Sequence, residues 1–117
     1  MDLETFQSLP APEIAGVVRS SGPKVCVFPI NGTRRWFMLE HTVPEGVDWA
    51  AAYCDVAAER HIDLYRIFFD HGISTLLTPI FGPDLLERGE EYARMAIEGL
   101  VLLATDSRFL TFYDEHD

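Results

Sequence analysis

Two short apolar runs constrain the fold more than any other feature of the sequence. The runs are Lys24–Pro29 and Ile73–Pro79, and both carry β-branched residues between turn-forming residues, a pattern typical of buried strands. Between them, apolar side chains recur at helical spacing from Val47 to His71, and Gly72 follows as a natural helix stop. A connection of this length predicts that the two strands run parallel.

The remaining segments predict further helices. The first covers Glu13–Val18 with Pro12 in its first turn, and a polar turn at Ile30–Trp36 opens into another helix. A long helix is expected from near Asp84 to about Ala104, and a last one from Asp106 to about His116. The sequence therefore predicts a single α/β domain over residues 1–117. Residues 1–22 form a helical extension, and residues 23–117 form a βαβαα core, a parallel-sheet βαβ unit with flanking helices.

Two strands are too few for a complete parallel sheet. Such sheets are stable when several strands share the ladder and both faces are covered. The expected helices also present more apolar surface than two strands can cover. We therefore expect a partial domain that is completed by further residues or by another chain, including a second copy of this one.

The charge balance narrows the choice of partners. The 117 residues hold 9 Lys and Arg against 19 Asp and Glu, for a net charge of −10. This balance argues against nucleic acid or an anionic membrane surface as the partner. The N-terminus lacks the pattern of a secretory signal, and the longest apolar stretch is too short for a transmembrane segment. A soluble, cytoplasmic protein is expected.

A polar loop after the first strand carries the residues suited to anion binding. Gly32 permits close backbone approach, Thr33 offers a hydroxyl, and Arg34 and Arg35 supply fork-shaped donors that match phosphate oxygens. A helix that begins here would add free N–H groups. These parts could bind a phosphate or diphosphate, although a surface turn with two solvated arginines has the same composition.

Apolar residues surround this loop in the sequence, and in open α/β sheets ligands bind beyond the carboxyl ends of the strands. Phe28 and Trp36 flank the loop, and Phe81 follows the second strand between prolines. Phosphate donors beside an apolar pocket suit an isoprenoid diphosphate. The four histidines show no metal-ligand spacing, so no metal site is predicted from them. A generic α/β module that binds a small phosphorylated molecule is the unrelated alternative.

The segment from Val27 to Trp36 resembles the first signature of cis-prenyltransferases, the undecaprenyl diphosphate synthase fold. In that family the first strand ends in a loop that binds a prenyl diphosphate. The resemblance is greater to the branch of tuberculosinyl adenosine transferases, also called tuberculosinol or isotuberculosinol synthases. It extends over nearly the whole chain and includes Gly22–Val25, Leu39–Glu40, Phe69–Ile73, Pro79–Phe81, Asp84–Gly89, Glu98–Gly99 and Phe112–His116.

This resemblance implies an enzyme that ionises an allylic terpenyl diphosphate and passes the cation to water or adenosine. Gly32, Thr33, Arg34 and Arg35 would bind the diphosphate, and Phe28, Trp36 and Phe81 would wall the pocket.

The chain departs from the family at two points. Asn31 occupies the catalytic position, where the family has Asp; its amide cannot act as a base and is a poorer ligand for Mg²⁺, the one cofactor that the resemblance brings in. The family's chains are more than twice as long, so this chain matches their N-terminal portion only. A catalytically impaired subunit or truncated relative that binds a partner chain is the alternative.

Overall fold

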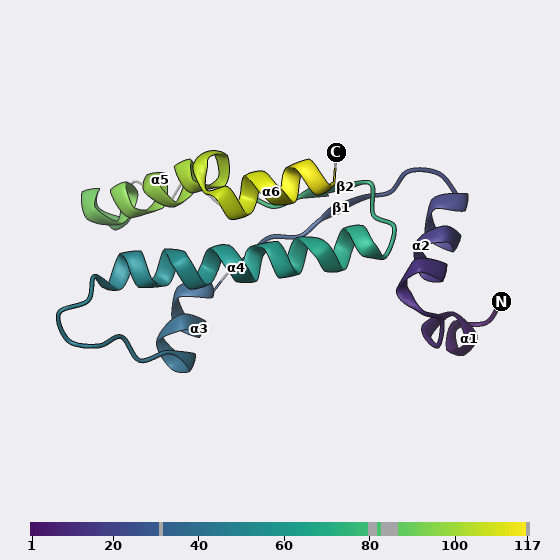
Figure 1. Ribbon diagram of the computed structural model, residues 1–117, viewed down its shortest axis with the longest axis horizontal. Coiled ribbons are helices and arrows are strands. Elements are labelled where there is room, and N and C mark those ends of the chain that lie inside the picture. The colour runs from purple at the N-terminus through teal and green to yellow at the C-terminus, as the bar shows by residue number, and fades with distance from the viewer. Residues whose placement is uncertain (31, 80–81, 83–86, 117) are drawn as a thin grey trace. The chain divides into compact units, whose positions relative to one another are not determined.

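The structure is a computed structural model that describes residues 1–30, 32–79, 82 and 87–116. The elements follow one another as α1 (Leu3–Gln7), α2 (Ala11–Ser20), β1 (Val25–Val27), α3 (Thr33–Glu40), α4 (Trp49–Asp70), β2 (Thr75–Leu77), α5 (Glu90–Thr105) and α6 (Ser107–Glu115) (Figure 1). Mixed helices with a small parallel sheet are compatible with the expected α/β class.

The chain divides into two compact units. The first unit comprises Met1–Pro29 and Asp63–Pro79, and the second comprises Ile30–Ile62 and Ile80–Asp117. Helix α4 therefore contributes its first part to the second unit and its last part to the first unit. The division does not follow the boundary expected after residue 22, and the single partial domain stays a prediction.

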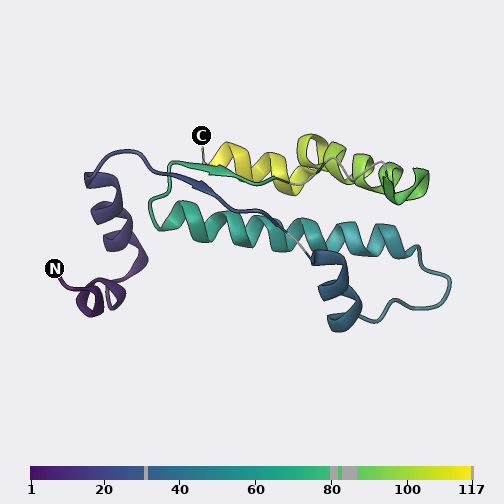
Figure 2. The same ribbon diagram turned by 180° about the vertical axis from the view of Figure 1, so that it is seen from behind.

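The two strands of the first unit pair in parallel, which confirms that prediction. Val25 lies opposite Thr75, and Val27 lies opposite Leu77 (Figure 2). The amide of Phe28 extends the ladder by donating to the carbonyl of Leu77 at 2.8 Å. The strand segments are shorter than the apolar runs, because hydrogen bonds to a single neighbouring strand hold only three residues on each side.

Within the first unit, one face of this sheet is left uncovered by the described residues. Val25 is 64% exposed, Val27 59% and Leu77 51%, although all three are apolar. Side chains alternate between faces along a strand, and the alternate positions Cys26 and Leu76 are half-buried. The sheet thus has one sheltered face and one exposed apolar face.

The end of α4 is held against α2 by a glycine. Ile73 N donates to Phe68 O at 3.1 Å and Gly72 N to Phe69 O at 3.1 Å, the bonds of a Schellman ending. Gly72 has φ +96°. A Cβ on this residue would lie 2.9 Å from the carbonyl oxygen of Ala15, so no other residue fits without moving α2.

The core of the second unit is aromatic. Phe37 is 1% exposed, Phe109 2% and Phe112 3%, and Ala58 and Ile62 of α4 are buried as well. Helices α5 and α6 join at Asp106, whose carboxylate accepts from the amide of Arg108 at 2.8 Å and begins α6.

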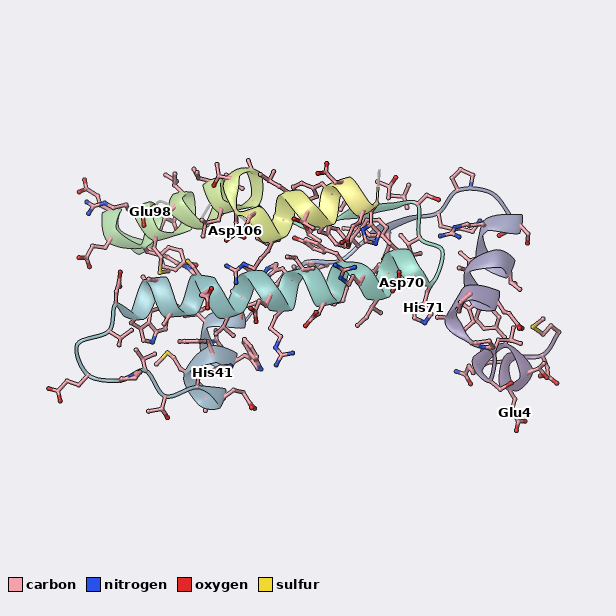
Figure 3. The ribbon with its side chains drawn as sticks, in the orientation of Figure 1. Glu4, His41, Asp70, His71, Glu98 and Asp106 are labelled. Carbon is pink, nitrogen blue, oxygen red and sulfur yellow. The ribbon has the colours of Figure 1, made fainter. Side chains whose placement is uncertain are left out.

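Arg108 then ties α6 to α4 in the same unit. Its guanidinium bonds the carboxylate of Asp106 at 2.9 Å and that of Asp55 at 2.8 Å, with Glu59 at 3.6 Å. Figure 3 labels Asp106 at the junction of the two helices. The hydrogen bonds from Arg108 lower the pKa of the Asp106 carboxyl below its ordinary value.

The helix predicted from near Asp84 to about Ala104 is confirmed over Glu90–Thr105, but its predicted start is wrong at the described residues 87–89. Glu87 and Arg88 form a short 3₁₀ turn, and α5 begins only at Glu90. The reason is Gly89, whose φ of +99° interrupts the helical path; Asp84 itself lies outside the described residues. Within the described ranges, no helix is both long and apolar enough to cross a membrane.

Candidate functional site

The start of α3 presents backbone donors next to two arginines. Gly32 precedes the helix with φ +74° and has no side chain to cap it, while its carbonyl accepts from Trp36 N at 3.0 Å. The first amides of a helix have no partner within the helix, and those of Thr33 and Arg34 occupy such positions. No acidic residue lies in this first turn, so the local field favours an anion.

The hydroxyl of Thr33 is hydrogen-bonded within the protein. Its Oγ1 lies 2.6 Å from the Oη of Tyr53 on α4, and both side chains are half-buried. The expected role of Thr33 in diphosphate binding therefore depends on its backbone amide. Tyr53 is a residue that the sequence did not single out for this site.

The two arginines have different surroundings. The guanidinium carbon of Arg34 lies 4.8 Å from the ring centre of Tyr92 on α5, a cation–π arrangement. Arg35 is exposed and, within the described part of the chain, makes no hydrogen bond or ion pair. Arg34 likewise forms no ion pair there, so neither cation is neutralised by a described carboxylate in this acidic chain.

A second arginine approaches the same tyrosine ring. Arg88 has its guanidinium carbon 5.1 Å from the ring centre of Tyr92 and donates from Nη1 to its Oη at 3.3 Å. Neither Arg88 nor Tyr92 was predicted as a site residue, since Tyr92 fits the apolar stripe of its helix. Their spacing of four residues is a signal for this contact, but it does not reveal that Arg34 shares the ring.

An aromatic cluster supports α3 from the α4 side. Phe37 stacks on His41 at 5.0 Å and meets Trp49 and Tyr53 edge-on at 5.6 and 5.5 Å. Trp36, half-buried, meets His41 edge-on at 5.4 Å, and His41 is labelled at the end of α3 in Figure 3. Trp36 thus stands beside the arginines on one side and an aromatic wall on the other.

The other predicted pocket residues lie elsewhere or outside the described residues. Phe28 belongs to the first unit, where its ring lies 5.2 Å from that of Phe68. Asn31 and Phe81 lie outside the described residues. The structure therefore brings together Gly32, Thr33, Arg34, Arg35 and Trp36 in one short segment, and the roles assigned to all these residues stay predictions.

A cavity of about 450 Å³ lies in the first unit, away from these residues in the sequence. Its apolar lining includes Phe6, Ile14, Val18, Phe68 and Ile73, with His71 among the few polar groups. The Nδ1 of His71 is bonded to the carbonyl of Ile67 at 2.6 Å. None of the predicted site residues that the structure describes lines this cavity.

The described side chains do not suit a metal ion. Among the residues that the structure describes, no cluster of three or more His, Cys, Asp or Glu side chains could hold a metal ion. The start of α3 offers arginines and amides, which bind anions and do not ligate cations. The described residues therefore do not fit a resident magnesium ion.

Comparison with known proteins gives one decisive similarity. No protein-family profile matches the chain. The chain is 46% identical over 112 residues to the tuberculosinyl adenosine transferase of Mycobacterium tuberculosis (strain CDC 1551 / Oshkosh), a match that takes in 96% of this chain and 36% of that protein. The predicted resemblance to this transferase is confirmed.

The match covers nearly all of this chain but only part of the transferase. Because it covers nearly the whole chain, the similarity includes the segment with the arginines as well as the helices around it. The chain spans about a third of the length of the transferase that it matches, 36%. The relation to a transferase is thus established at the level of sequence, and the wider cis-prenyltransferase fold remains a prediction.

Proposed function

We propose that this chain belongs to an enzyme that binds an allylic terpenyl diphosphate of the tuberculosinyl type and promotes loss of its diphosphate. The observation that carries the proposal is the 46% identity, over 96% of the chain, to a protein named tuberculosinyl adenosine transferase. The finer mechanism rests on the residues at the start of α3.

The diphosphate would be held by Arg34, Arg35 and the amides of Gly32 and Thr33. A departing diphosphate gains negative charge, and preorganised donors aimed at that charge lower the barrier. Guanidinium groups bind phosphoryl oxygens through two parallel N–H bonds. Both arginines lack a described carboxylate partner, which supports their availability to a substrate.

The hydrocarbon part of the substrate would lie along aromatic side chains. Trp36 stands beside the arginines, and Phe28 and Phe81 are the further wall residues that we propose. An apolar, water-excluding wall protects an allylic cation until water or adenosine captures it. Asn31 would orient a substrate group through its amide, since this side chain cannot accept a proton as a carboxylate does.

Magnesium enters the proposal only as a companion of the substrate. In proteins Mg²⁺ binds through one or two carboxylates together with substrate phosphates, and the described residues do not fit the protein's share of such a site. The assay of pyrophosphate release is therefore run with and without added Mg²⁺.

A second candidate is a catalytically impaired subunit that completes its fold with another chain or a second copy. It is favoured by the exposed apolar face of the sheet, where Val25, Val27 and Leu77 are each more than half exposed. Asn31 at the family's Asp position supports the same candidate. Sedimentation separates the possibilities, because a monomer that unfolds cooperatively would contradict a need for a completing chain.

The test of the proposed function measures pyrophosphate release. The purified chain is incubated with geranylgeranyl-type and bicyclic allylic diphosphates, with and without adenosine. We expect release from the bicyclic substrate, and we expect Arg34→Ala to weaken pyrophosphate binding in calorimetry by about tenfold or more, as for loss of a charge-assisted hydrogen bond. Binding that is unaltered in Arg34→Ala would contradict the proposed site. Binding without release would favour the impaired subunit.

A further inference from the structure

The cavity of the first unit is lined mainly by apolar side chains from separate segments of the chain. Helices α1 and α2, the end of α4 and the residues before β2 contribute them: Phe6, Ile14, Val18, Ile67, Phe68 and Ile73. All belong to the same unit, and the volume of about 450 Å³ falls in the range of pockets that hold small molecules. Ile67 is 58% exposed although apolar, so a ligand that covers it gains binding energy.

Two polar side chains, Gln7 and His71, also line the cavity. The Nδ1 of His71 lies 2.6 Å from the carbonyl oxygen of Ile67. Because a carbonyl oxygen only accepts, Nδ1 carries a proton, and in the neutral ring Nε2 is left as an acceptor. Among the described residues, no donor bonds this Nε2. The cavity thus offers an acceptor for one hydroxyl group, and the amide of Gln7 can donate to the oxygen of that group.

The charges of this unit do not favour an anionic ligand. Its basic side chains, Arg19, Lys24 and Arg66, do not line the cavity. Two exposed carboxylates, those of Glu4 and Asp70, belong to helices that do line it, and Figure 3 labels both. Placing an unpaired phosphate in an apolar cavity is costly, so the cavity suits a neutral ligand.

We propose that this cavity is a second ligand site, which binds an uncharged terpenyl alcohol through its apolar wall and a hydrogen bond to His71 Nε2. The choice of a terpenyl alcohol rests on the proposed function, because capture of the allylic cation by water yields one. The oxygen of water forms the new bond to carbon, and one water proton passes to solvent. The site would keep the hydrocarbon part of this alcohol out of water.

The experiment measures binding of tritium-labelled farnesol to the full chain by equilibrium dialysis at pH 8, where histidine rings are ordinarily neutral. Farnesyl diphosphate should displace farnesol at least about tenfold less effectively, because its charge is not compensated in the cavity. The straight-chain alcohol 1-dodecanol should compete severalfold less effectively, because it lacks the methyl branches that add buried apolar area. Equal competition by either compound, or displacement of farnesol by inorganic pyrophosphate, would overturn the inference.

A pair of substitutions in α2 tests the location. Ile14→Trp fills the cavity and should weaken farnesol binding by about tenfold or more. The matched control is Val17→Trp, in the same helix, because Val17 is 40% exposed and does not line the cavity. It should change the affinity by less than about twofold, with far-ultraviolet circular dichroism unchanged in both variants. Equal farnesol affinity in the two variants would overturn the inference.

The role of His71 is tested with the ligand as well as with the protein. Farnesyl methyl ether keeps an oxygen that accepts from Gln7 but has no proton for Nε2, so the wild-type chain should bind it about fivefold more weakly than farnesol. His71→Phe should remove this preference. Equal binding of the two ligands to the wild-type chain would overturn the inference without any variant.

The outcome is separable from that of the proposed function. Pyrophosphate release without farnesol binding would overturn this inference alone. Farnesol binding that Ile14→Trp abolishes, in a chain that releases no pyrophosphate, would support the cavity as a site for terpenyl alcohols and contradict the proposed function.

Discussion

The two units of this chain are stabilised in different ways. The first unit depends on close backbone packing, with Gly72 against Ala15, around a small parallel sheet that leaves apolar side chains exposed. The second unit depends on interlocked side chains, with stacked aromatic rings around Phe37 and ion pairs around Arg108. All the arginines proposed to bind diphosphate belong to the second unit.

This difference explains why the proposed polar site lies in the second unit. A polar or charged site needs side chains that are held by other side chains, and the second unit provides them through Tyr53 and Tyr92. The first unit has a backbone contact with no tolerance for a larger residue. Substitutions should therefore act through lost side-chain contacts in the second unit and through steric overlap in the first.

The tryptophans make the comparison measurable. The chain has two, Trp36 and Trp49, and both belong to the second unit. Tryptophan fluorescence reports on that unit alone, whereas far-ultraviolet circular dichroism reports on the helices of both. A substitution that affects only one unit should therefore change these two signals to different extents.

Phe37→Ala should have the largest effect. The side chain is 1% exposed and contacts His41, Trp49 and Tyr53, so its loss leaves a cavity and three rings without a neighbour. We expect the free energy of unfolding to fall by about 3–5 kcal/mol, measured by urea denaturation. Fluorescence should lose its transition at lower urea than circular dichroism does. Coincident shifts in both signals would show that the two units do not differ in this way.

Gly72→Ala is the corresponding change in the first unit. The new Cβ would lie 2.9 Å from the Ala15 carbonyl oxygen, at a φ of +96° that alanine rarely adopts. We expect a loss of about 2–4 kcal/mol, seen first in circular dichroism. Gly22→Ala is the control, because Gly22 has φ +94° but no atom within 4 Å of the new Cβ, and it should cost about 1–2 kcal/mol. Equal losses would exclude steric overlap as the cause.

The ion pairs of Arg108 predict a pH dependence of the second unit. Hydrogen bonds from Arg108 lower the pKa of Asp106 in the folded state from its ordinary 3.8. The carboxylate therefore contributes stability that is present above pH 3.8 and is lost as the pH falls through the lowered value. The fluorescence-detected unfolding free energy should decrease from about pH 4 downward.

Two variants test the source of this dependence. Asp106→Asn keeps an acceptor for the amide of Arg108 but carries no charge, so the acid-induced loss below about pH 4 should become smaller. Arg108→Met should cost about 1 kcal/mol at neutral pH, because the partners are partly exposed. An unchanged acid profile in Asp106→Asn would assign the effect to other carboxylates.

The sequence predicted the parallel strands and the long helix correctly because these features have local signals. Apolar runs between turns mark strands, and a connection as long as Val47–His71 requires parallel pairing. The division into two units could not be predicted, since α4 is a continuous helix with no composition change where the units divide. The interruption at Gly89 has no clear local signal, because the acidic residues on both sides of it are typical of the first turn of a helix.

Only the contiguous part of the candidate site could be predicted from the sequence. Gly32–Trp36 stands together in the sequence, so its anion-binding character could be inferred from residue types. Tyr53 and Tyr92 reach this segment from other helices, and only the folded chain places them there. Arg88 joined the candidate site for the same reason, through its contact with Tyr92.

Tyr53→Phe should have the smallest effect and the most specific one. It removes the hydroxyl that lies 2.6 Å from Thr33 Oγ1 but keeps the ring that stacks on Trp49 at 5.5 Å. We expect a loss of about 1 kcal/mol, typical of one hydrogen bond, and Thr33→Val should lose a similar amount. Because both variants break the same bond, the double variant should lose little more than either one, and fully additive losses would mean that the two hydroxyls do not stabilise each other.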